Sequence, residues 1–231
     1  MKDFTLFMLP FGGGNETSYQ KFEQYLDKKI KMINGEAPGH GRRIKEPLLK
    51  NMYLIADTYF DQFKNLIKEP YAIYGHSMGA YIGHLMIQRI VDEKLPLPKH
   101  FFITSKVAPS RNYNKKRSIY TDEQFVRHLR DLKGMPDAIL GNEELLKIFL
   151  PIIRSDFDAL DLYKYKAREP YPVDMTLMGG THEDVTDEQL TDWKKETNGT
   201  FSFERLEGYH FWIFDHLPEL CKRINETLEK Y

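Results

Sequence analysis

Ser77 lies in a setting that suits a nucleophile. It is the centre of a glycine-flanked segment, Gly75-His76-Ser77-Met78-Gly79, between an apolar run typical of a strand and a longer apolar run with helical spacing. A serine at a tight strand-to-helix turn is held in a strained conformation with its hydroxyl exposed, and side chains at the flanking glycines would collide with the neighbouring strand and helix. The pattern therefore predicts that Ser77 attacks a carbonyl carbon.

Among the eight histidines, His210 is best placed to act as the base that Ser77 requires. A serine hydroxyl is a weak nucleophile until a base takes its proton. In sites built on such a turn, the base follows the last strand, and the chain order is serine, acid, histidine. His210 lies directly after the last expected strand, whereas His216 belongs to the helical pattern that continues to the C-terminus. We therefore predict that His210 is the base.

The acid of such a triad is expected in the turn after the preceding strand, residues 175–178. That turn offers two neighbouring carboxylates, Glu183 and Asp184. Either could accept the proton on Nδ1 of the histidine, which fixes the tautomer and stabilises the imidazolium. We favour Asp184, because a short side chain on a turn is easier to hold rigid, and Glu183 is the alternative.

Backbone amides complete the predicted site. The oxyanion of a tetrahedral intermediate needs two N–H donors. We assign them to Met78, the residue after the nucleophile, and to Phe11, in the glycine-rich turn after the first strand. That turn lacks the spacing of a phosphate-binding loop or a dinucleotide fingerprint. Since no Cys/His cluster has metal-ligand spacing either, we expect neither a cofactor nor a metal.

The order of elements predicts an α/β chain. Short apolar runs alternate with longer amphipathic ones, which is the pattern of a parallel sheet flanked by helices. The expected strands are residues 4–9, 30–34, 71–74, 101–105, 175–178 and 201–206. With the serine, acid and histidine each after a strand, the chain resembles the α/β-hydrolase fold, a mostly parallel central sheet in a single domain over residues 1–231.

Residues 112–166 interrupt this alternation. They contain helical patterns over 123–132, 143–153 and 156–165, with no strand between them. Helices inserted at this point would lie as a lid over the strand ends, where binding groups collect in open parallel sheets. A plain helical crossover is the alternative interpretation.

Composition limits the function classes further. The chain has 231 residues, of which 41% are hydrophobic and 29% charged, and its formal net charge of −1 offers no basic field for nucleic acid. The single cysteine, Cys221, makes no intrachain disulfide, so the fold needs no oxidising compartment. No stretch has the length of a membrane span or the pattern of a signal peptide. We expect a cytoplasmic monomer that binds neither nucleic acid nor membrane.

Longer segments resemble one family, the type II thioesterases that accompany non-ribosomal peptide and polyketide synthases. The likeness extends over nearly the whole chain, and the segments within 112–166 are more specific than the serine turn, which many hydrolases share. The segments that carry it are Leu9-Pro10-Phe11-Gly12-Gly13-Gly14, Pro38-Gly39-His40-Gly41-Arg42-Arg43, Gly75-His76-Ser77-Met78-Gly79-Ala80, Leu132-Lys133-Gly134-Met135-Pro136, Asn142-Glu143-Glu144-Leu145, Leu150-Pro151-Ile152-Ile153-Arg154-Ser155-Asp156-Phe157 and Gly208-Tyr209-His210-Phe211.

The resemblance implies hydrolysis of acyl thioesters on the phosphopantetheine arm of acyl- or peptidyl-carrier proteins. It also implies removal of stalled or aberrant acyl units during antibiotic biosynthesis. The arm belongs to the substrate, so no cofactor is implied for the chain itself. Two features depart from the family pattern: Tyr209 replaces a usual glycine, and Glu183 and Asp184 lie around the position of the usual aspartate.

Other functions could use the same residues. A small-molecule carboxylesterase or an acyltransferase would need the same triad, and in the transferase a hydroxyl or an amine would replace water. A non-catalytic protein that binds carrier proteins would need only the surface around the site. A strong preference for acyl-carrier over the matching free thioester would exclude a simple esterase, and a phenotype that survives Ser77→Ala would indicate binding.

Overall fold

Six parallel strands form the centre of the molecule. The computed structural model describes residues 3–68, 70–111, 116–133 and 141–231. The sheet has the order β2-β1-β3-β4-β5-β6, and every neighbouring pair is parallel. The expected sheet is confirmed, with each strand within two residues of its expected bounds. The strands are β1 (Phe4–Leu9), β2 (Ile30–Asn34), β3 (Tyr71–His76), β4 (His100–Thr104), β5 (Asp174–Gly180) and β6 (Phe201–Leu206).

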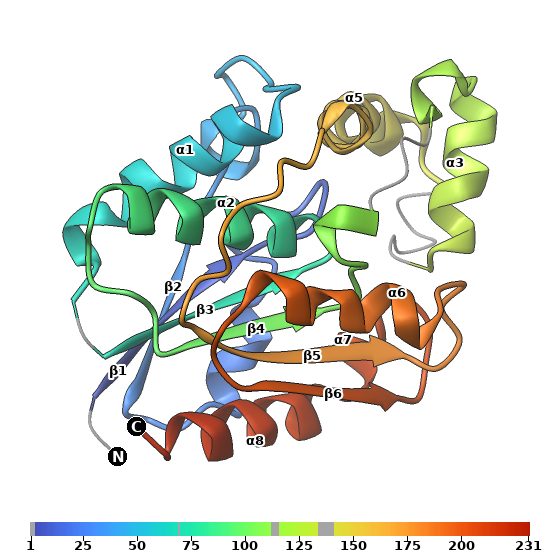
Figure 1. Cartoon of the computed structure of the whole chain (residues 1–231). Coiled ribbons are helices and arrows are strands. Elements are labelled where there is room, and N and C mark those ends of the chain that lie inside the picture. Colours follow the sequence, from blue (N-terminus) through green and yellow to red (C-terminus); the bar gives the residue numbers. More distant parts are fainter. Residues whose placement is uncertain (1–2, 69, 112–115, 134–140) are drawn as a thin grey trace.

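Helices cover both faces of this sheet (Figure 1). α1 (Met52–Phe63) and α2 (Met78–Asp92) lie on one face, and α8 (Leu217–Leu228) lies on the other. Within the described ranges, no helix combines the length and the apolar character that crossing a membrane requires. The shorter helices are α6 (Asp187–Thr191), α7 (Trp212–Asp215), η1 (Gln20–Gln24), η2 (Gly41–Arg43), η3 (Lys64–Leu66), η4 (Pro109–Arg111), η5 (Arg117–Ile119) and η6 (Asp192–Glu196).

The alternation of side chains along the strands divides the buried residues between two cores. In β1, Phe7 and Leu9 pack with α1 and α2, whereas Leu6 and Met8 pack on the opposite face with α8. Successive side chains of a strand point to opposite faces of the sheet. A strand buried on both faces therefore appears in the sequence as a continuous apolar run, which is how the strands could be recognised.

Two further helices, α3 (Asp122–Asp131) and α5 (Glu143–Leu162), lie beyond the carboxyl ends of the strands (Figure 1). They share a small core of their own, in which the ring of Phe125 packs edge-on against Phe157 with ring centroids 5.3 Å apart. The parts of the expected lid over 112–115 and 134–140 lie outside the described residues. The described helices thus cover the edge at which Ser77 lies.

Helix α5 corrects one expectation. The two helical patterns over 143–153 and 156–165 form a single helix of 20 residues that ends at Leu162. The helix continues through the polar residues in its middle because groups outside it satisfy them. The Ser155 hydroxyl donates to the Leu49 carbonyl, and Asp156 also has partners on other segments. Pro151 costs the helix one backbone hydrogen bond without ending it.

Two glycines allow β1, β3 and α2 to meet at Ser77. A Cβ atom on Gly75 would lie 2.4 Å from the carbonyl oxygen of Gly79, and a Cβ atom on Gly79 would lie 2.0 Å from that of Leu9. Between them, Ser77 has φ 53° and ψ −114°, a sparsely populated conformation that costs about 1–3 kcal/mol. The turn that presents the serine therefore depends on close backbone approaches that only glycine permits.

Gly79→Ala should destabilise the protein, because the added methyl group must displace the end of β1 or the start of α2. We expect the free energy of unfolding to fall by about 2 kcal/mol or more, measured by urea denaturation. Val91→Ala is the control, because Val91 is an exposed residue of the same helix, and it should change that free energy by less than about 0.5 kcal/mol. A Gly79→Ala protein as stable as its parent would contradict this packing.

Candidate active site

Ser77 and His210 meet at the carboxyl edge of the sheet. Ser77 links β3 to α2, and His210 lies in the loop that follows β6. The Ser77 hydroxyl donates to Nε2 of His210 over 2.9 Å. The Ser77 backbone N–H donates to the carbonyl of Thr104 at the end of β4, which anchors the turn. The structure thus brings together the two side chains that the sequence pattern selected, whereas His216 lies at the start of α8.

Glu183, and not Asp184, contacts the histidine. Oε1 of Glu183 accepts the Nδ1–H of His210 over 2.8 Å, which leaves Nε2 as the acceptor for the serine. Asp184 is exposed, and the preference for it was wrong. That preference assumed that the shorter side chain would be the more rigid one. Glu183 is instead made rigid by its hydrogen-bond partners, and its extra methylene lets it reach the imidazole.

Three donors fix the Glu183 carboxylate. Besides His210, the Gly180 N–H donates to Oε2 over 2.7 Å and the Ser105 hydroxyl donates to the same oxygen over 3.0 Å. Burial acts to raise the pKa of Glu183, but the hydrogen bond and charge of His210, together with the other two donors, outweigh burial and lower it. Glu183 is therefore held as a carboxylate that can stabilise a positive charge on the imidazole.

Ser105 supports this carboxylate and was not expected from the sequence. Its hydroxyl accepts from Nε1 of Trp212 over 2.9 Å while it donates to Glu183. Its backbone has φ 52°, and its N–H donates to the carbonyl of Met178. The available signal was a polar residue just past a buried strand, where binding groups collect. A single serine in a turn is too common for that signal to be distinctive.

His76 packs against the reacting histidine without competing for its role. The ring centroids of His76 and His210 are 5.1 Å apart, and Nδ1 of His76 is 2.9 Å from the Thr104 hydroxyl oxygen. Burial, together with the nearby His210, lowers the pKa of His76 well below its ordinary value. His76 is therefore neutral, and together with the ring of Phe211 it forms a packed wall that limits rotation of His210.

The glycine-rich turn after β1 lies against the start of α2. The Phe11 carbonyl accepts the Gly14 N–H over 2.8 Å, and Gly13 has φ 79°, as the third residue of a type II turn requires. Met78 is the first residue of α2, where a backbone N–H has no partner within the helix. Since Gly79 brings the two segments into contact, Phe11 and Met78 lie on adjoining turns, and their role as oxyanion donors stays a prediction.

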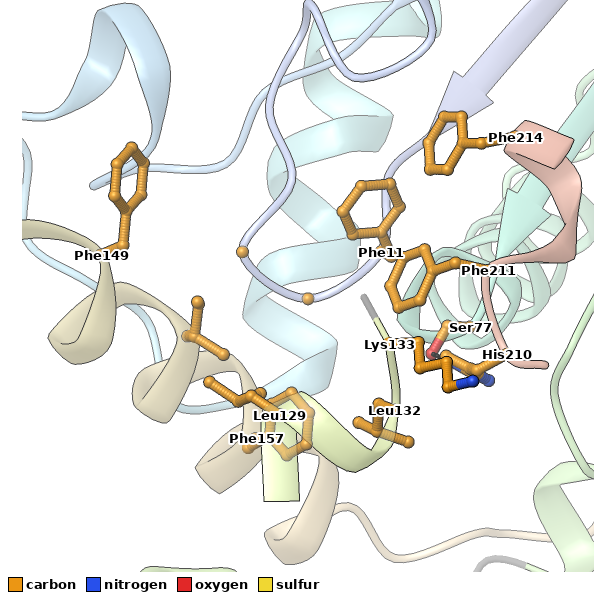
Figure 2. Close-up of a pocket in the computed structure, with 13 residues that line it drawn as sticks. Phe11, Ser77, Leu129, Leu132, Lys133, Phe149, Phe157, His210, Phe211 and Phe214 are labelled. Carbon is orange, nitrogen blue, oxygen red and sulfur yellow. Dashed lines mark hydrogen bonds between the residues drawn. The ribbon is translucent and has the colours of Figure 1, made fainter. Parts of the chain in front are cut away.

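An apolar cavity of about 460 Å³ opens beside Ser77 (Figure 2). Its walls come from the glycine-rich turn, from α3 and α5 with the residues that follow α3, and from the segment after β6. The size and the mainly aromatic and aliphatic lining suit an apolar group next to the nucleophile. The lining residues are Phe11, Gly12, Gly13, Ser77, Leu129, Leu132, Lys133, Phe149, Ile153, Phe157, His210, Phe211 and Phe214.

Tyr209, which departs from the family pattern, connects the histidine loop to the inserted helices. The ammonium of Lys133, just past α3, lies 3.7 Å from the centre of the Tyr209 ring. Such a cation–π contact contributes about 0.5–1 kcal/mol at an exposed site. Tyr209 is 44% exposed and is not among the residues that line the cavity, so it lies at the surface and does not fill the cavity.

Comparison with known proteins places the chain in a family. The family model described as the thioesterase domain matches residues 4–228. The chain belongs to the thioesterase family. The gramicidin S biosynthesis protein GrsT of Aneurinibacillus migulanus is 31% identical to this thioesterase over 96% of the chain and 90% of its own length.

Solved structures agree with this assignment. ClbQ, from the colibactin non-ribosomal peptide and polyketide pathway, superposes with a TM-score of 0.93 at 26% identity and covers 99% of this thioesterase and 98% of its own chain. BorB, a type II thioesterase from the borrelidin biosynthetic cluster, has a TM-score of 0.89 at 26% identity over 96% of this chain and 91% of its own. Fold, family and site geometry therefore all indicate a serine-dependent thioester hydrolase.

Glu183→Gln should reduce turnover far more than Asp184→Asn. The amide at position 183 cannot stabilise the imidazolium and can leave His210 in the wrong tautomer, so we expect kcat on a nitrophenyl ester to fall at least about 100-fold. Asp184→Asn is the matched control on the adjacent residue and should keep kcat within about twofold. The reverse order of the two effects would show that Asp184 is the acid after all.

The stability that Glu183 contributes should decline in acid. Because its pKa is lower in the folded protein than in the unfolded chain, this stability is present above the ordinary carboxyl pKa and is lost as pH falls through the folded value. The parent protein should therefore lose stability relative to Glu183→Gln as pH falls below the ordinary carboxyl pKa of 4.5. Urea titrations of both proteins at several pH values measure this difference in unfolding free energy. A relative gain in the parent's stability in acid would contradict an ionised Glu183.

Proposed function

We propose that this chain is a stand-alone type II thioesterase, which hydrolyses acyl thioesters carried on the phosphopantetheine arm of carrier proteins. The observation that supports this most directly is the chain of hydrogen bonds from Ser77 through His210 to Glu183 at the wall of an apolar cavity. The relatives point the same way, because their names assign them to gramicidin S and borrelidin biosynthesis. The cellular role would be to free carriers of stalled or aberrant acyl units.

In the proposed acylation step, Ser77 Oγ attacks the thioester carbonyl carbon. His210 Nε2 takes the hydroxyl proton as the new C–O bond forms, and Glu183 stabilises the resulting imidazolium. The backbone N–H groups of Phe11 and Met78 stabilise the negative charge on the former carbonyl oxygen. The C–S bond then breaks, and the departing thiolate of the arm receives the proton from His210. The products are an acyl ester on Ser77 and a free carrier thiol.

Deacylation repeats the sequence with water. His210 takes a proton from the attacking water as the new C–O bond forms. It then returns a proton to Ser77 Oγ as the ester bond breaks, which releases a carboxylic acid. The proposed reaction uses side chains and backbone amides of this chain alone. All of these groups belong to one chain, which is consistent with a monomeric enzyme.

The cavity suggests where the acyl group lies. Phe149 and Phe157 of α5 and Leu129 of α3 face the cavity from the inserted helices, and the rings of Phe11 and Phe211 lie near the serine (Figure 2). Burial of an apolar acyl chain there would contribute about 25 cal/mol per Å² removed from water. We propose that the inserted helices act as a lid, which opens to admit the arm and closes over the acyl group.

The test is hydrolysis of carrier-bound acyl groups, followed by mass spectrometry of the carrier. The parent protein should convert several acyl-carriers to the free thiol form, and Ser77→Ala should reduce the rate at least about a thousandfold. The same acyl group on a small soluble thiol is the control substrate. A large excess of kcat/KM for the carrier form supports the proposal. Equal values for both substrates would indicate a small-molecule esterase, and unchanged turnover by Ser77→Ala would exclude this site.

A further inference from the structure

A buried carboxylate outside the triad joins the inserted helix α5 to the glycine-rich turn. Oδ2 of Asp156 accepts the backbone N–H of Gly13 over 2.6 Å and lies 2.9 Å from Nε2 of His40. The exposure of the Asp156 residue is 3% and that of His40 is 4%. A buried charge of this kind is costly unless it is paired and hydrogen-bonded. The proposed reaction assigns no task to either side chain.

The groups around His40 suit its charged form. Nδ1 of His40 lies 3.0 Å from the carbonyl oxygen of Pro38, which can only accept, and Nε2 faces the Asp156 carboxylate. A carbonyl and a carboxylate both accept, so this arrangement suits a ring with a proton on each nitrogen. Burial opposes this charge, but the hydrogen bond and charge of Asp156, the Pro38 carbonyl and the nearby Glu36 together raise the pKa of His40. Asp156 thus has the His40 ring on one side and the Gly13 amide on the other.

The second contact of α5 with the same turn is steric. A Cβ atom on Gly13 would lie 2.6 Å from Cγ1 of Ile153, so the helix packs directly on the Gly13 backbone. Asp156 and Ile153 are three residues apart and lie on the same face of α5. One residue binds the N–H of Gly13 and the other limits its outward movement. The turn that begins at Phe11 is therefore clamped from the side of the inserted helix.

From these contacts we infer that the Asp156–His40 ion pair positions the turn that supplies the Phe11 N–H to the oxyanion. Asp156 acts on the reaction through the backbone of Gly13, and His40 holds the side chain of Asp156 in place. Neither residue touches the substrate, so both are positioning residues. The inference rests on the proposed function in its use of an oxyanion at Ser77, which any acyl substrate would generate, and of the Phe11 N–H as a donor to it.

The clamp also couples the acyl cavity to the oxyanion donors. Ile153 and Phe157, on either side of Asp156 in the chain, line the cavity, and so does Gly13. A displacement of α5 that opens the cavity would withdraw the acceptor from Gly13 at the same time. The site would therefore be assembled for reaction only while α5 is seated on the turn.

The experiment compares Asp156→Ala, Asp156→Asn and Asp158→Asn with a nitrophenyl ester. This substrate needs no carrier, so failure of the carrier assignment would leave the result intact. Asp156→Ala removes the acceptor of the Gly13 N–H, and we expect kcat to fall about 10- to 100-fold with KM within about threefold, since loss of an oxyanion donor costs about 100- to 1000-fold. Asp156→Asn keeps an acceptor for Gly13 but removes the charge that pairs with His40, so we expect a smaller fall in kcat, about three- to tenfold.

Asp158→Asn is the matched control, because Asp158 lies on the same helix and pairs with Lys50, away from the turn. It should leave kcat unchanged. The distinguishing measurement is the affinity for a trifluoromethyl ketone that mimics the oxyanion, which Asp156→Ala should weaken by the same factor as kcat. A fall in kcat without this loss of affinity, or an equal fall in Asp158→Asn, would overturn the inference.

A second variant keeps the inference testable if Asp156→Ala does not fold. His40→Gln removes the cation and leaves the Asp156 carboxylate able to accept from Gly13. We expect a smaller fall in kcat, about three- to tenfold, with a matching loss of trifluoromethyl ketone affinity. Unchanged kcat and unchanged affinity in folded His40→Gln would contradict the role of the ion pair.

Discussion

The imidazole of His210 must reach a serine that follows a strand three positions away in the sheet. Ser77 comes after β3 and His210 after β6, with β4 and β5 between them. In a parallel sheet all carboxyl ends lie at the same edge, so each strand can deliver a residue to one place. Glu183 follows β5 and Ser105 follows β4, so both also lie at this edge. The register of the whole sheet is therefore a condition for the 2.9 Å contact between Nε2 and Oγ.

Two buried carboxylates, Glu183 and Asp156, both need hydrogen-bond donors, but they have different roles. Glu183 is satisfied by an imidazole, a hydroxyl and a backbone amide. Asp156 is satisfied by an imidazolium and a backbone amide. In each case a buried carboxylate needs such donors, because removing an unpaired charge from water is costly. Glu183 faces a histidine that must gain and lose a proton, whereas Asp156 faces a histidine whose pKa is raised by Asp156 itself and that takes no part in the proposed proton transfers.

The sequence predicted those features that depend on local pattern. The glycines around Ser77 can be recognised because few residue types tolerate the backbone contacts there, and the six strands can be recognised as short, fully buried apolar runs. His210 follows from its place after the last strand. These inferences needed only residue types and spacing, and the six-stranded parallel sheet confirms the fold that they implied.

Features that depend on partners distant in the chain could not be predicted in this way. Sequence spacing does not show whether the side chain of Glu183 or of Asp184 points toward the imidazole. That direction depends on the Gly180 amide and the Ser105 hydroxyl, which bind the carboxylate. The unbroken helix through Ser155 has the same cause, since its hydroxyl is satisfied by Leu49, 106 residues away. The pairing of Asp156 with His40 joins residues 116 positions apart, and no local pattern records it.

The most direct test of Ser77 as the nucleophile is to locate the acyl group on the enzyme during turnover. The protein would be mixed with an acyl-carrier, quenched with acid within the first turnover, digested and analysed by tandem mass spectrometry. If Ser77 is the nucleophile, an ester adduct of the acyl mass is expected on its side chain. An adduct on another side chain, such as Cys221, or thioester cleavage with no adduct on Ser77 at any quench time, would contradict this role of Ser77.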